Sequence, residues 1–224
     1  MQRSVKQRFG VLVITVGVLA IVGSAFESIW LRPARTIAWI EDIGGLVEYK
    51  PVDNQGMDAL DKYLDARTWL PRCFTYSVQR VFLDHSAITD EQLANVATLR
   101  DLRELSLSGT EIDGSGLRHL KNMASLVFLD LSHSSINDSS LSHLRALGLT
   151  LLNLSDTKLT DNGLQHLKGL RLAYIGLART QVTDAGLAQL SPCYLSLDVR
   201  ETQVSKTFID KAERSRPIAY VLHD

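Results

Sequence analysis

Three histidines are the residues of this sequence whose type and spacing come nearest to a metal site. His119, His143 and His166 each precede a leucine, at intervals of 24 and 23 residues. Imidazole is a common metal ligand, but a zinc ligand must lie about 2 Å from the metal. Helices packed side by side lie about 8–10 Å apart. We therefore interpret the three histidines as exposed residues on successive outer helices and predict no metal site.

A second pair of histidines, His85 and His133, shares another repeated position. Asp84 stands beside His85 and could pair with it as an acid–base couple, but no candidate nucleophile recurs near them. The sequence also contains no Gly-x-Ser-x-Gly, phosphate-loop or His-Glu-x-x-His motif. We predict a protein that is not an enzyme and that takes no cofactor.

The elements that carry these residues repeat along the chain. Two aliphatic positions separated by one residue recur at intervals of 24, 24, 23, 23 and 22 residues. Such alternation is typical of a short strand with its aliphatic side chains on one face. The six pairs are Val81/Leu83, Leu105/Leu107, Leu129/Leu131, Leu152/Leu154, Ile175/Leu177 and Leu197/Val199.

Each predicted strand is followed by a hydroxyl side chain, which we expect to bond backbone groups in a turn. The six hydroxyl residues are Ser86, Thr110, Ser134, Thr157, Thr180 and Thr202. Residues that cap helix N-termini come next, at Thr89-Asp90, Asp113, Asn137-Asp138, Thr160-Asp161 and Thr183-Asp184. Leucines three residues apart, such as Leu117 and Leu120, then indicate one buried helix face. Strand, turn and helix make a unit that buries its apolar face only by stacking on its neighbours.

This pattern, L-x-x-L-x-L-x-x-(N or substitute)-x-L, is that of leucine-rich repeats. The segments 159–164 and 182–187 read Leu-Thr-Asp-Asn-Gly-Leu and Val-Thr-Asp-Ala-Gly-Leu. They resemble the T-D-x-G-L repeats of bacterial leucine-rich-repeat proteins of the planctomycete type. The resemblance implies an α/β leucine-rich-repeat solenoid of short parallel strands and outer helices.

The N-terminus predicts one transmembrane helix. Basic residues within 1–8 precede an uncharged, largely aliphatic segment at 9–26. As a helix these 18 residues would rise about 27 Å, close to the roughly 30 Å hydrocarbon core. The basic flank favours a cytoplasmic N-terminus, with the repeats outside the cytoplasm. The alternative is a cleaved signal peptide and a secreted or periplasmic protein.

The remaining segments are predicted to cap the solenoid. We assign an N-terminal helix and strand cap to 33–77, with a helix ending at Gly44-Gly45, a strand at 46–49 and a second helix at 57–66. The six repeats occupy 78–214, and an edge strand closes the chain within 215–224. The two cysteines, Cys73 and Cys193, fit either one disulfide or two thiols.

The outward side of the strands is the predicted binding surface, because a solenoid sheet presents an extended concave face to partners. Phe82, Asp130 and Arg200 are the leading binding candidates there, joined by Asp84, Asn153 and Asp198. The full predicted set is Phe82, Asp84, Ser106, Ser108, Asp130, Ser132, Asn153, Ser155, Gly176, Ala178, Asp198 and Arg200.

The sequence thus predicts a membrane-tethered protein-interaction module whose protein partner it does not identify. A structural spacer of the cell envelope, without a discrete ligand, is the alternative. The net charge of −1 shows no basic surplus of the kind that indicates nucleic-acid binding.

Overall fold

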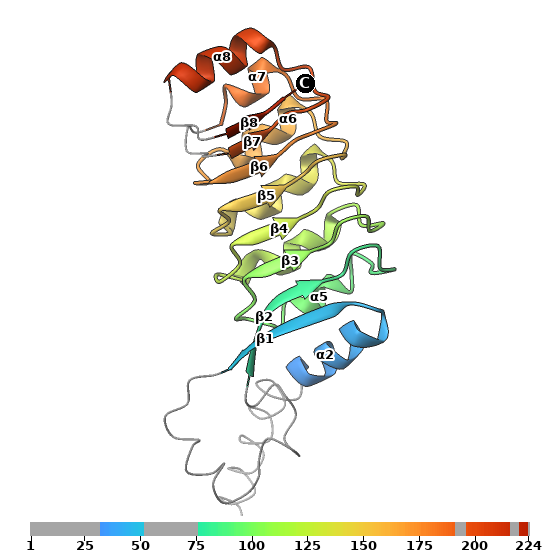
Figure 1. Ribbon diagram of the computed structural model, residues 1–224. Helices are drawn as coiled ribbons and strands as arrows, with labels where there is room; N and C mark the ends of the chain where they lie inside the picture. The colour runs from blue at the N-terminus through green and yellow to red at the C-terminus, as the bar shows by residue number, and fades with distance from the viewer. Residues whose placement is uncertain (1–31, 52–75, 191–195, 216–219, 224) are drawn as a thin grey trace, which may run out of the picture.

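The computed structural model describes residues 32–51, 76–190, 196–215 and 220–223. They form one eight-stranded sheet in chain order, β1 to β8, with the helices along one side of it (Figure 1). β1 pairs antiparallel with β2, and every later pair is parallel. The strands are β1 (Leu46–Pro51), β2 (Tyr76–Phe82), β3 (Glu104–Ser106), β4 (Phe128–Asp130), β5 (Leu151–Asn153), β6 (Tyr174–Gly176), β7 (Ser196–Asp198) and β8 (Tyr220–Leu222). The predicted solenoid of parallel strands and outer helices is confirmed.

The core is a ladder of aliphatic side chains between the sheet and the helices. Leu105, Leu129, Leu152 and Ile175 are in register on neighbouring strands and are fully buried. The second residue of each predicted pair, such as Leu131, is buried as well. The alternation of two therefore places the repeated aliphatics inward, as predicted.

The six hydroxyl side chains after the strands all make the same hydrogen bond. Each donates to the carbonyl three residues earlier, at 2.5–2.7 Å, as Thr157 does to Leu154. The carbonyl group at the end of the strand thereby gains a partner inside the turn. The predicted role of these residues in the turns is confirmed.

The outer helices are short, and several are 3₁₀-helices. Leucines three residues apart fall on one face at three residues per turn, which suits that geometry. Leu117 and Leu120 in η3, and Leu141 and Leu144 in η4, are fully buried in this way. The helices are α2 (Arg32–Asp42), α5 (Leu93–Val96), η3 (Ser115–Asn122), η4 (Asp138–Ala146), α6 (Asp161–Leu164), η5 (Gln165–Leu167), α7 (Asp184–Leu187) and α8 (Lys206–Ser215).

The two residues of each Thr-Asp pair make different hydrogen bonds. The sequence analysis predicted that both would cap the helix. Thr183 caps α7, because its hydroxyl accepts from Ala185 N at 3.2 Å. Asp161 instead bonds the next repeat, accepting from Thr183 N at 2.8 Å and from Thr183 Oγ1 at 2.6 Å. Asp138 and Asp184 bond the following repeats in the same way, through Thr160 and Ser205. The aspartates therefore connect repeats.

The N-terminal cap begins with α2, which buries Thr36, Ile37 and Ile40. Gly44 follows with φ +82°, and Gly45 N donates to Ile40 O at 2.8 Å. This confirms the predicted glycine C-cap. The predicted strand at 46–49 is β1, which extends to Pro51. The predicted helix at 57–66 lies outside the described residues.

Several predictions fall partly or wholly outside the described residues. The predicted membrane or signal segment at 9–26 lies outside them, as do Cys73 and Cys193. Within the described ranges no helix is long and apolar enough to cross a membrane. The predicted edge strand is β8, the last strand of the sheet, and it pairs with β7.

Candidate protein-binding face

The sheet has one face turned away from the helices, which we call the open face. Three rows of side chains run across it from strand to strand. The second row consists of the residues between the paired aliphatics, and the third row consists of the residues directly after each pair. Together these two rows contain the twelve residues predicted from the sequence. The first row, set by the strand register, consists of Arg80, Glu104, Phe128, Leu151, Tyr174 and Ser196.

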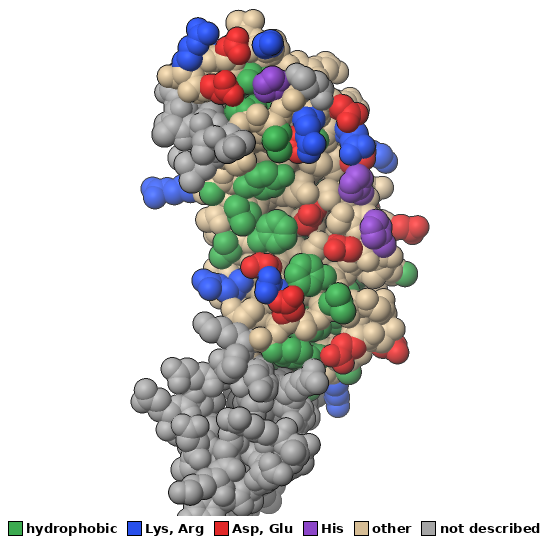
Figure 2. All heavy atoms as spheres, in the orientation of Figure 1, with side chains coloured by type: hydrophobic (Ala, Val, Ile, Leu, Met, Phe, Trp, Pro, Cys, Tyr) green, Lys and Arg blue, Asp and Glu red, His purple; other side chains and the backbone are tan. Residues whose placement is uncertain are grey.

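The first row contains an apolar patch that the sequence analysis missed. Phe128, Leu151 and Tyr174 are in register on β4, β5 and β6, and each is half-buried. Neighbouring strands lie about 4.8 Å apart, so the three side chains are adjacent. Figure 2 shows hydrophobic side chains along this face, over the middle of the sheet. We call these three residues the central apolar patch.

Asp130 and Asn153 form a hydrogen-bond network beside this patch. Asn153 Nδ2 donates to Asp130 Oδ2 at 3.0 Å, which joins β4 to β5. Asp130 Oδ1 accepts from Ser132 N at 2.8 Å and from Ser132 Oγ at 2.6 Å. The structure therefore brings these two predicted residues together in a fixed polar network.

Asp198 and Arg200, also predicted, form a bidentate ion pair. Arg200 Nε lies 2.9 Å from Asp198 Oδ1, and Nη2 lies 2.7 Å from Oδ2. Burial acts to raise the pKa of Asp198, but hydrogen bonds from Arg200 and its positive charge outweigh burial, so the pKa is lowered. The carboxylate is therefore held ionised on the open face, with its charge balanced by the guanidinium.

Tyr174 lies at the centre of this arrangement. A Cβ at position 176 would come within 2.7 Å of Tyr174 Oη, so Gly176 leaves the space that the phenol occupies. Burial raises the pKa of Tyr174, and the negative charges of Asp198 and Asp130 raise it further. The phenol thus stays protonated near neutral pH and can donate a hydrogen bond to a bound molecule.

Phe82 and Asp84 occupy the N-terminal end of the open face. Asp84 Oδ1 accepts from Ser108 N at 3.1 Å and, at short range, from Ser106 Oγ. The conceivable Asp84–His85 couple is therefore not formed, because Asp84 bonds the next strand. His85 instead packs its ring over Gly109 of that repeat.

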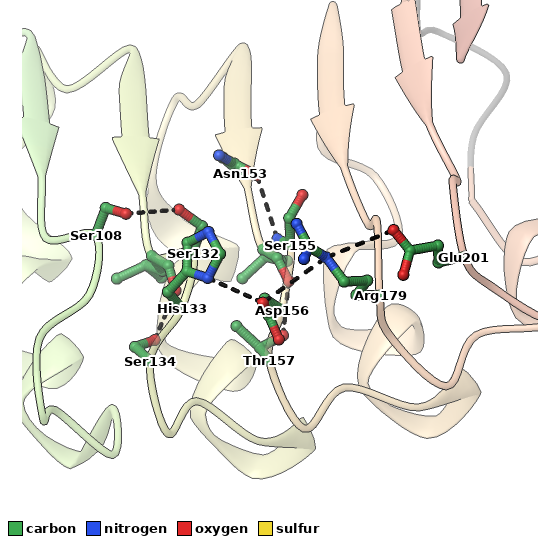
Figure 3. A network of polar contacts seen from close by, with 12 residues as sticks. Ser108, Ser132, His133, Ser134, Asn153, Ser155, Asp156, Thr157, Arg179 and Glu201 are labelled. Carbon is green, nitrogen blue, oxygen red and sulfur yellow. Dashed lines mark hydrogen bonds and ion pairs between the residues drawn. The ribbon is translucent and has the colours of Figure 1, made fainter. Parts of the chain in front are cut away.

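A charge ladder runs along the turns that follow the strands (Figure 3). His133 Nδ1 lies 2.9 Å from Asp156 Oδ2, and Arg179 Nε lies 3.8 Å from the same oxygen. Arg179 also pairs with Glu201 at 3.9 Å. All four residues have φ between +54° and +57°, so they share one left-handed backbone conformation in successive turns. Ser134 Oγ, next to His133, donates to the Leu131 carbonyl.

The three histidines first considered for a metal site lie on the outer helices, as predicted. They are half-buried, where the sequence analysis expected exposed side chains. His119 and His143 line one groove between η3 and η4. In the part of the chain that the structure describes, no group of three or more His, Cys, Asp or Glu side chains is placed to hold a metal.

The first row could have been found from the sequence. The residue before each repeated pair, as well as the residue between its two members, faces outward when side chains alternate. Phe128, Leu151 and Tyr174 each stand directly before a pair. The sequence analysis assigned only the positions between and after the paired aliphatics, and so missed this row.

Comparison with known families finds one similarity within the repeats. The family model described as "Leucine Rich repeat" matches residues 98–120 and 149–168. These two segments are similar to a leucine-rich repeat. A search of curated proteins finds no match to this chain.

Three solved structures are similar to this chain over part of their length. Internalin C2 of Listeria monocytogenes is 21% identical, with a TM-score of 0.45, over 59% of this chain and 56% of that one. An internalin F of the same bacterium is 20% identical, with a TM-score of 0.41, over 60% and 38%. The Arabidopsis receptor kinase HAESA, in complex with a peptide hormone and a co-receptor, is 16% identical, with a TM-score of 0.44, over 78% and 30%. The chain spans about half or less of these proteins.

Proposed function

We propose that this leucine-rich-repeat protein is an interaction module that binds a protein partner on its open face. The central apolar patch carries the proposal. Phe128, Leu151 and Tyr174 place apolar surface on three successive strands, on the side of the sheet away from the helices. Adjacent apolar and aromatic side chains within a polar rim are typical of the energetically dominant part of a protein interface.

The charges around the patch indicate what kind of partner surface fits. Within the described residues, neither Asp84 nor Asp130 forms an ion pair with a cation, whereas Asp198 is balanced by Arg200. The open face therefore leaves two carboxylates to attract positive charge. The partner that fits presents apolar side chains to the central patch and a lysine or arginine to Asp130.

Leu151→Glu is the sharpest test of this proposal. The full chain and the variant would be used to capture proteins from a cell-envelope extract, and captured proteins would then be titrated against each chain. A charge in the patch should weaken the partner's binding by at least about tenfold, since interface hot spots contribute about 2 kcal/mol or more.

Gln165→Glu is the matched control, because it adds the same charge at an exposed position on an outer helix. A partner that binds the open face should be retained by this control and lost by Leu151→Glu. Capture of the same proteins by both variants would contradict the proposal and would favour a spacer role.

We further propose that residues 9–26 tether the protein to a membrane as a single span, with its N-terminus cytoplasmic and the repeats on the other side. The support is an uncharged segment of 18 residues that follows Arg3, Lys6 and Arg8. Mass spectrometry of protein from the membrane fraction should find a mature chain that retains this segment. A soluble chain that begins near Phe26 would instead indicate a cleaved signal peptide.

A further inference from the structure

A basic groove lies on the outer side of the solenoid, away from the open face. It has a volume of about 900 Å³ and runs between η3 and η4. Arg118, His119, Lys121, His143 and Arg145 supply its charged and imidazole side chains. None of the eight described residues that line it is acidic. We call it the outer groove.

The groove arises from one repeated tripeptide. His-Leu-Lys at 119–121, His-Leu-Arg at 143–145 and His-Leu-Lys at 166–168 occupy equivalent places in three successive repeats. The central leucine of each is buried in the core, so the histidine and the cation flank it on the outside. Stacking of the repeats therefore sets Lys121 beside Arg145, and His119 beside His143.

Neighbouring like charges are unfavourable for the fold itself, because each repels the next. A single cation at a helix C-terminus gains modestly from the helix dipole. This stabilisation by the helix dipole does not offset the repulsion among several neighbouring cations that have no counter-charges. In the described part of the chain, no carboxylate forms an ion pair with Arg118, Lys121 or Arg145.

The carboxylates at the starts of the outer helices bond other residues. Asp113 accepts from Ser115 N at 2.8 Å. Asp138 accepts from Thr160 N and Oγ1, and Asp161 accepts from Thr183 N and Oγ1. Asp138 and Asp161 stand at the N-terminal ends of η4 and α6, whereas Lys121 and Arg145 stand in the last turns of η3 and η4. The fold thus separates the two signs of charge and leaves the outer groove positive.

We propose that the outer groove binds the phosphate groups of an anionic ligand. Guanidinium and ammonium groups form short, charge-assisted hydrogen bonds with phosphate oxygens, and arginine can do so with two bonds at once. Asn122 and Ser142 add uncharged donors to the lining. Three cations from two neighbouring helices line the groove, which suits a diphosphate or a phospholipid headgroup.

Two probes separate the two sources of phosphate. Sodium pyrophosphate would be titrated into the full chain in a nonionic detergent, followed by calorimetry and by the NMR signals of His119 and His143. Flotation would compare vesicles of phosphatidylcholine alone with vesicles of equal parts phosphatidylcholine and phosphatidic acid. The neutral vesicles account for any insertion of the apolar segment at 9–26.

The test variant is Lys121→Gln with Arg145→Gln, and the matched control is Lys158→Gln with Lys206→Gln. Both pairs lose two positive charges, and the control residues are exposed and lie outside the groove. Pyrophosphate should bind the groove variant at least about tenfold more weakly than the control, since charge-assisted hydrogen bonds are the strong ones. In the groove variant, adding pyrophosphate should no longer shift the NMR signals of His119 and His143.

The outcomes are distinct. Pyrophosphate binding that is lost only in the groove variant supports a site for free phosphates, and a loss of the preference for phosphatidic acid alone supports a lipid headgroup. Absence of binding to both probes, or an equal loss in the groove variant and the control, would overturn the proposal. Leu151→Glu on the open face should leave phosphate binding unchanged, so this result is separate from that for the protein partner.

Discussion

Replacing Leu152 with alanine is expected to lower the free energy of unfolding by about 2–5 kcal/mol. Leu152 is the middle residue of β5 and is fully buried, in register with Leu129 and Ile175 on the neighbouring strands. Truncation removes its apolar contacts and leaves a cavity between two repeats. Because a solenoid is stabilised by contacts between neighbouring repeats, the substitution weakens the packing of the β5 repeat against the repeats before and after it.

Leu151→Ala is the matched control, because the same side chain is shortened one position away on the opposite face of β5. Leu151 lies half-buried in the central apolar patch, so its truncation leaves no cavity in the core. We expect it to cost about 1 kcal/mol or less. Urea unfolding of the full chain, followed by circular dichroism, measures both variants. Equal destabilisation by the two would contradict the assignment of opposite faces.

This pair of leucines also shows how far the sequence could predict the fold. The spacing of Leu152 and Leu154, repeated in six registers, was enough to predict parallel strands with a common core. Alternation makes that inference strong, since a slip of one residue would turn every leucine outward. The hydroxyl positions were predictable too, because Ser and Thr side chains satisfy backbone groups in turns.

The apolar patch was harder to recognise because Phe128, Leu151 and Tyr174 differ in type. A repeated leucine stands out as a pattern, whereas this row reads Arg, Glu, Phe, Leu, Tyr, Ser along the chain. The spacing of the repeated pairs aligns these three positions, and the strand register places their side chains on adjacent strands. A binding face need not repeat, because its residues are selected for a partner and not for stacking.

The side-chain contacts between repeats, in contrast, could not be predicted from the sequence. The His133–Asp156–Arg179 ladder joins residues 23 positions apart, and its side chains differ from repeat to repeat. The same is true of Asp161, whose carboxylate reaches the next repeat at Thr183. A capping residue and a bridging residue look alike in sequence, since both are polar and stand at a helix start.

Gly116→Ala is the second substitution with a large expected effect. Gly116 N donates to Asp90 Oδ1 at 2.7 Å, and Gly114 N donates to the same oxygen at 3.1 Å. The start of η3 is therefore held against Asp90 of the preceding repeat. A Cβ at position 116 would overlap the Asp90 carbonyl oxygen and lie 2.7 Å from Asp90 Cα. The overlap is with backbone, which a rotamer change cannot relieve.

We expect Gly116→Ala to destabilise the chain by about 1–3 kcal/mol, and by more if the hydrogen bonds to Asp90 are also lost. Gly148→Ala is the control, because a Cβ there lies 3.9 Å from the nearest atom, Ala124 O. That variant should be neutral or stabilised by up to about 1 kcal/mol, since alanine restricts the unfolded chain. Urea unfolding distinguishes the two variants.

An Asp90→Asn background separates the two causes of the Gly116→Ala effect. Asparagine keeps the backbone and one side-chain oxygen but removes the negative charge. If overlap with the Asp90 backbone is the cause, the cost of Gly116→Ala should persist in this background, because the obstructing atoms are unchanged. If the cost disappears, the charge of Asp90 governs the contact, and the close approach of the two repeats at Gly116 is not what makes glycine necessary there.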